Sequence, residues 1–298
     1  LQQLVSPVFD KSIGDTELAF DTIAKIKEFR DRRRDGELIG QVVSTEIVKP
    51  YRRSLLIDSL AISVKTDRPF AIRLLDFFSN HFSVSAPTQS MKILSPILER
   101  DAIAPNLFGQ FEDLIIAVEQ HPAMLVYLNN TKSVGPNSPI GKRTRGLNEN
   151  LAREILELHT LGIDGGYTLE DIRQLAMAIS GWSITNDRDT KPAGFRFRIK
   201  GHEPGERNIL GKSYPAGGVT QGQAVLRDLA RHKKTAQFVS YKLAQHLIAD
   251  EPPKELVAAM VNTWVKTEGN IKAVVTSLVR HPQSWDSQSK KLKTPREF

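Results

Sequence analysis

The stretch LNENLAREILELHTLGIDGGYTLEDIRQLAMAISGW, residues 147–182, predicts two helices joined by a short glycine turn. Asn148 can cap the first helix, because its side-chain oxygen can accept a free N–H of the first turn. Gly162 stands where the chain must leave that helix, and glycine tolerates the left-handed backbone found there. Thr168 opens the second helix with Asp171 three residues later, which is the spacing of a capping box.

The first of these helices has two unlike faces. At about 100° per residue, Leu151, Ile155 and Leu158 share one arc, which we expect to face the core. Glu154 and Glu157 lie on another arc, within about 60° of each other by the same helical geometry. The two carboxylates can therefore act together on one object.

Three neighbours decide what this polar face can do. Asn150 and Arg153 lie beside the carboxylates, whereas His159 points roughly away from them. His159 can belong to the same site only if it contacts the ligand from a different side of the site than the two carboxylates do. Arg153 and Glu157 also have the i, i+4 spacing of a helical ion pair, so an ordinary structural network is an open alternative.

Two further stretches match a pattern together with residues 147–182: NHF at residues 80–82, and HPAML at residues 121–125 followed by YL at residues 127–128. With them the chain resembles the bacterial family named domain of unknown function 1800. The resemblance covers roughly residues 50–298. It implies a mostly helical protein from bacteria that often export it, and it assigns no reaction.

Helical periodicity runs through most of the chain, so we expect an all-α fold, an irregular multi-helix bundle. Residues 195–199, FRFRI, alternate apolar and basic side chains, which predicts a small β-hairpin or flap around residues 183–218. We expect one helical domain over residues 1–298, with residues 219–298 as a C-terminal helical subregion. The chain starts at Leu1 instead of Met, and we expect it to be trimmed at both ends.

The histidines fall into three groups. His81 ends a predicted helix, where it either favours the helix dipole or forms a wall of an active cleft. His121, His232 and His281 each follow the end of one helix and precede a new helix or turn, so we expect structural roles at these junctions. His202 lies in the flap, and we expect it to be exposed, because loops are mostly surface.

Composition excludes several classes of function. The chain has no cysteine, which rules out disulfides, thiolate metal sites and a cysteine nucleophile. No apolar run is long enough for a transmembrane segment. The net charge of +7 comes from scattered basic residues without interleaved aromatics, which argues against a nucleic-acid partner. Phosphate loops, nucleophile elbows and zinc-protease motifs are all absent.

A carboxylate pair on one helical face suits two kinds of chemistry. In a shared cleft one carboxyl can hold its proton while the other stays ionised, as acid–base hydrolysis requires. The pair can also hold a divalent metal ion. The orientation of His159 fits that second option poorly, so the metal remains unknown.

We therefore expect an acid–base hydrolase or lyase, with Glu154 and Glu157 as its catalytic residues. Its substrate would be a polar or anionic polymer such as a glycan, because the basic run at residues 142–145 precedes the helix. The alternative is a non-enzymatic binding or assembly module. The family resemblance implies a periplasmic or extracellular location, and the sequence gives no oligomeric state. The expected substrate contacts are His81, His121, Asn148, Asn150, Arg153 and His159.

Overall fold

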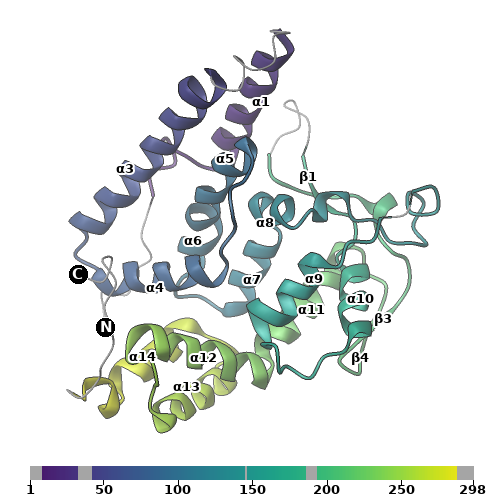
Figure 1. Cartoon of the computed structure of the whole chain (residues 1–298). Helices are drawn as coiled ribbons and strands as arrows, with labels where there is room; N and C mark the ends of the chain where they lie inside the picture. The colour runs from purple at the N-terminus through teal and green to yellow at the C-terminus, as the bar shows by residue number, and fades with distance from the viewer. Residues whose placement is uncertain (1–8, 33–41, 145, 186–192, 287–298) are drawn as a thin grey trace.

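The computed structural model describes residues 9–32, 42–144, 146–185 and 193–286. Over these residues the protein is mostly helical, with two small antiparallel strand pairs, which confirms the predicted fold class (Figure 1). Buried apolar side chains form one cluster from Phe9 to Leu278. The predicted boundary at residue 219 remains a prediction.

The N-terminal helices form an arm at the upper left of Figure 1. Helix α1 is Thr16–Arg32, and a second helix consists of a π-helical start, η1 (Val43–Val48), continued by α3 (Lys49–Lys65). Pro50 lies inside this continuous helix, two residues after the π-helical turn, where its missing N–H leaves one helical hydrogen bond unformed.

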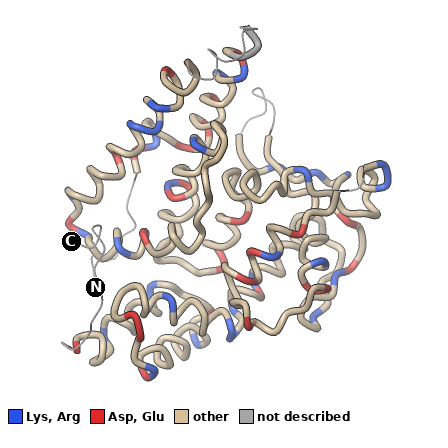
Figure 2. The backbone as a smooth tube through the Cα atoms, in the orientation of Figure 1, with Lys and Arg blue, Asp and Glu red and all other residues tan. Residues whose placement is uncertain are grey.

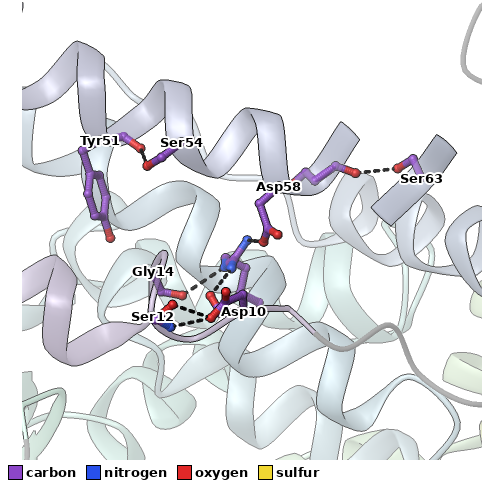
Figure 3. A network of polar contacts seen from close by, with 9 residues as sticks. Asp10, Ser12, Gly14, Tyr51, Ser54, Asp58 and Ser63 are labelled. Atoms are coloured by element: carbon purple, nitrogen blue, oxygen red, sulfur yellow. Dashed lines mark hydrogen bonds and ion pairs between the residues drawn. The ribbon is translucent and has the colours of Figure 1, made fainter. Parts of the chain in front are cut away.

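Arg100 ties this arm to the body of the protein. The residue is 5% exposed, and its guanidinium forms an ion pair with Asp58 of α3, 2.6 Å from the carboxylate. The same guanidinium donates hydrogen bonds to the carbonyl oxygens of Gly14 (3.0 Å) and Asp10 (2.7 Å), in the segment before α1 (Figure 3). One buried cation therefore holds the N-terminal segment and α3 together.

The central helices follow. Proline at the first turn starts α4 and α8, and the Thr88 hydroxyl accepts the N–H of Met91 to cap α5. Pro96 lies within α5, three residues before the π-helical turn η2. The central elements are α4 (Pro69–His81), α5 (Gln89–Leu98), η2 (Glu99–Ile103), α6 (Ala104–Asn106), α7 (Phe111–Glu119) and α8 (Pro122–Tyr127).

Residues 147–182 form the two predicted helices. The first is α9 (Asn150–Glu154), continued by the π-helical turn η4 (Ile155–Thr160), and the second is α10 (Leu169–Ala178). The capping box between Thr168 and Asp171 is present in both directions. Gly162 has a φ of 83°, as expected of a residue that ends a helix in the left-handed region.

The predicted flap consists of two hairpins. Strand β1 (Trp182–Ile184) pairs with β2 (Phe195–Phe197), and β3 (Arg207–Ile209) pairs with β4 (Lys212–Tyr214). The prediction that His202 is exposed is wrong. It is 9% exposed, and its Nδ1 hydrogen-bonds the carbonyl of Ser180 at 3.0 Å, because the flap folds back onto the end of α10.

Four helices follow in the described residues up to 286: α11 (Val219–Arg231), α12 (Lys233–Leu247), α13 (Lys254–Lys266) and α14 (Ile271–Arg280), with a short 3₁₀ turn, η6 (Pro282–Trp285), after them. Helix α11 packs on α7, and α13 packs on both α12 and α14 at the bottom of Figure 1. Helix α12 also contacts α4 and η4, so it reaches the helix that carries the predicted site.

Candidate functional site

The predicted site helix is α-helical only over its first five residues. From Ile155 to Thr160 its hydrogen bonds span one residue more, and this π-turn shifts the faces relative to an α-helix. Leu151 and Ile155 are fully buried, as predicted. The prediction that Leu158 faces the core is wrong, because it is 45% exposed, and His159 takes the inward position with 4% exposed.

The outward face carries the predicted carboxylates. Arg153 Nη1 lies 3.2 Å from Glu157 Oε1, so the ion pair expected at i, i+4 is present. Burial and the neighbouring Glu157, which accepts a hydrogen bond from the Tyr167 hydroxyl, raise the pKa of Tyr167. Glu154 is half-buried, and its side chain forms no hydrogen bond or ion pair with any other residue that the structure describes. The catalytic role of both glutamates remains a prediction.

A polar basin of about 720 Å³ lies at the start of this helix. Asn148 shapes it: its Oδ1 accepts the first-turn N–H of Asn150 (2.9 Å), as predicted, and its Nδ2 donates to the Leu128 carbonyl (3.0 Å). The N-cap position itself is taken by Glu149, whose side chain makes no cap hydrogen bond. The exposed side chains of Asn129, Lys132 and Asn150 are directed to solvent. The lining residues are Asn129, Lys132, Gly146, Leu147, Asn148, Glu149 and Asn150.

The inward face meets a buried polar cluster. Glu119, at the end of α7, is fully buried, and its Oε1 lies 2.8 Å from His159 Nδ1. His81 Nε2 lies 3.1 Å from the His159 carbonyl oxygen, and Lys242 Nζ lies 3.0 Å from His81 Nδ1. These four residues form what we call the buried cluster, and they join α7, η4, α4 and α12.

The partners fix the protonation pattern of His81. A carbonyl can only accept, so Nε2–H donates to it, and Nδ1 accepts from the Lys242 ammonium. Burial, and next the Lys242 charge, hold the pKa of His81 well below its ordinary value, so the ring is neutral at neutral pH. Burial also lowers the pKa of Lys242.

The structure thus divides the predicted site residues. His81 and His159 come together, but they are 6% and 4% exposed and lie on the side of the helix opposite to the carboxylates. A substrate would reach them only after local opening. Asn148 and Asn150 line the basin, and Arg153 lies one turn further along the outward face.

His121 is separate from both groups. Its Nδ1 accepts the N–H of Ala123 at 3.1 Å and caps α8, which confirms the structural role predicted for this junction. Burial lowers its pKa to about 3. His232 caps α12 in the same way, by accepting the N–H of Lys234, whereas the His281 side chain makes no cap hydrogen bond.

Sequence reasoning missed two members of the buried cluster. Glu119 follows Phe111 and Ile115 at spacings of eight and four residues, so it lies on the apolar stripe of its helix. A carboxylate on such a stripe is a detectable signal, because a buried charge needs a partner. Lys242 carries no comparable signal, since it lies on a half-buried position of α12.

The described residues contain no group of three or more histidines and carboxylates placed to hold a metal ion. They also contain no helix long and apolar enough to cross a membrane. Basic and acidic residues are interspersed over the elements seen in Figure 2, which agrees with the scattered charge of the sequence.

The family model described as protein of unknown function (DUF1800) matches residues 6–298. The chain belongs to the DUF1800 family. No curated protein and no solved structure matches it. The NHF stretch and the site helix of this DUF1800 protein meet at the buried cluster through His81 and His159, whereas His121 of the HPAML stretch caps α8 outside it.

Proposed function

We propose that this DUF1800 protein binds a polar polymer with anionic groups, of the glycan class, in the basin at the start of the site helix. The basin itself is the observation that carries the proposal. Its volume of about 720 Å³ suits a small-molecule segment, and its exposed Asn129, Lys132 and Asn150 offer donors and acceptors to hydroxyl groups. Lys132 and the exposed Lys142 and Arg143 of the preceding loop favour an anionic chain.

The outward face of the helix supports binding more directly than catalysis. Glu157 is held by Arg153, and this is the structural network expected of a binding module.

Affinity electrophoresis tests the proposal. Gels would contain alginate, a polyuronate, or dextran, a neutral glucan. We expect alginate to retard the protein and the variant Lys132→Ala/Asn150→Ala to lose most of that retardation. The matched control is Asn262→Ala/Lys272→Ala, which removes an exposed asparagine and an exposed lysine from α13 and α14. No retardation, or equal loss in both variants, would overturn the proposal.

Acid–base cleavage of the same polymer, by hydrolysis or by a lyase reaction, is a second candidate function. One observation favours it: Glu154 lies one turn beyond Asn150, is half-buried, and has no partner among the described residues. In this mechanism Glu154 gives a proton to the glycosidic oxygen of the bond that breaks, and a water molecule that loses its proton to Glu157 adds to the sugar carbon. Incubation with alginate should release new sugar ends, and Glu154→Gln should abolish release while gel retardation persists. Retardation of the protein by alginate without release of new sugar ends would contradict catalysis and support binding only.

We also propose that the protein works in the periplasm or outside the cell. The absence of cysteine is compatible with an oxidising compartment, and glycans are accessible there. Fractionation of cells that express the full-length protein tests the location. Recovery in the cytoplasmic fraction would contradict it.

A further inference from the structure

Helix α3 presents an exposed apolar face on the arm. Leu56, Ile57, Leu60 and Val64 are 56%, 54%, 49% and 82% exposed. At about 100° per residue these four side chains share one side of the helix. A contiguous exposed apolar patch of this kind marks an interaction surface.

The opposite side of α3 packs against the body of the protein. Leu55 is 2% exposed, and Asp58 is bound by Arg100, so this side is fixed to the body (Figure 3). Helix α3 is therefore apolar on two sides, and within the described part of the chain only one of them is buried.

Basic residues accompany the exposed apolar side chains. Lys49, Arg52 and Arg53 are exposed and lie on the same side, in the first turns of the helix. The single acidic residue of α3 is Asp58, and its charge is paired with that of Arg100. The face thus combines net positive charge with aliphatic side chains, as helices that lie on anionic membranes do.

A cavity of about 560 Å³ adjoins this face, between α3 and the body. Arg52 and Leu56 belong to both the face and the cavity wall. Acyl chains have room beside the helix, and the arginine heads can extend to the headgroups while their stems stay apolar. The apolar residues that line the cavity are Leu55, Leu56, Phe82, Val84, Pro96, Leu98 and Ile103.

We propose that α3 docks this protein onto an anionic lipid bilayer, lying in its surface with Leu56, Ile57, Leu60 and Val64 inserted. A protein partner fits less well, because protein interfaces are enriched in aromatic residues and this face has none. The inference is independent of the glycan proposal, which concerns the basin at the start of α9.

Vesicle flotation tests the proposal with phosphatidylglycerol–phosphatidylcholine vesicles and with phosphatidylcholine alone. We expect the protein to float with the anionic vesicles only, and less at high salt. Leu60→Gln/Val64→Gln should lower the partition coefficient on the order of tenfold, and Arg52→Gln/Arg53→Gln by a similar or larger factor. The matched control, Ile163→Gln/Ile199→Gln, removes two exposed apolar residues elsewhere and should float as the wild type does.

A second measurement covers variants that fail to fold. Leu60→Trp keeps the face apolar, and its fluorescence should shift to the blue when phosphatidylglycerol vesicles are added. No flotation of the wild type, flotation that the α3 variants leave unchanged, or no blue shift would each overturn the proposal. A dimer that Leu60→Gln/Val64→Gln dissociates, without vesicle binding, would show a self-association face and would also overturn it.

Discussion

The inner and outer faces of residues 150–160 each pair a carboxylate with a basic side chain, yet the two pairs differ in burial. Glu119 and His159 meet inside the protein, where the carboxylate is fully buried and the imidazole 4% exposed. Arg153 and Glu157 meet on the surface, with side chains 39% and 28% exposed. When one member of a buried pair is removed, the remaining polar group is left without a hydrogen-bond partner. When one member of a surface pair is removed, the remaining group is hydrated by water. The two faces should therefore respond very differently to the same substitution.

Glu119→Ala should have the largest effect. Removal of one member of a buried pair costs about 3–5 kcal/mol of unfolding free energy, because the remaining group loses its partner without reaching water. Urea unfolding followed by circular dichroism measures this loss. The same substitution on the outer face, Glu157→Ala, is the matched control and should cost about 1 kcal/mol or less. Equal losses would contradict the contrast between the faces.

The π-turn makes a second contrast, between neighbouring leucines. Leu156 is fully buried and Leu158 is 45% exposed. Leu156→Ala should cost about 2–5 kcal/mol, because it removes a core side chain and leaves a cavity. Leu158→Ala should cost about 1 kcal/mol or less by the same unfolding measurement. A larger cost at Leu158 would indicate the regular α-helical register.

Two histidine caps allow a pH test of burial. The pKa of His121 in the folded protein is about 3, below its ordinary value of 6.5 because of burial, so between these values only the unfolded chain binds its proton. Stability from this group is complete above pH 6.5 and falls as the pH decreases, by about 1.4 kcal/mol per pH unit. His121→Asn keeps a capping oxygen and should flatten the dependence of unfolding free energy on pH by that slope.

The matched variant is His232→Asn. His232 makes the same cap at an exposed position, and burial lowers its pKa as well. Because the ring is exposed, its substitution should change the slope much less. A slope that remains unchanged in His121→Asn would show that His121 does not resist protonation.

The smallest effect is expected at Tyr167. Its pKa is raised by burial and by Glu157, so Glu157→Gln should lower it toward the ordinary value near 10. Absorbance titration of the tyrosinates, compared with the wild type, measures the change. The variant Glu154→Gln is the control on the same helix and should leave the Tyr167 titration unaltered.

Local signals in the sequence predicted several helix ends of the fold. The hydrogen bonds of Thr168, His121 and Asn148 to first-turn backbone N–H groups all formed as expected, because each side chain reaches a donor two or three residues away. The expectations for Leu158 and His202 were wrong for different reasons. The first assumed 100° per residue through a π-turn, and the second assumed that a loop residue stays at the surface.

The sequence by itself determined the helices, their caps, the small flap and the membership of the DUF1800 family, since these depend on short spacings and local hydrogen bonds. Only the tertiary structure decided which polar residues far apart in the sequence meet. Glu119 and His159 are 40 residues apart, and His81 and Lys242 are 161 apart. No periodicity in the sequence encodes such pairs. They arise when the packing of separate helices removes water from both side chains, so that each side chain can form a hydrogen bond only with the other.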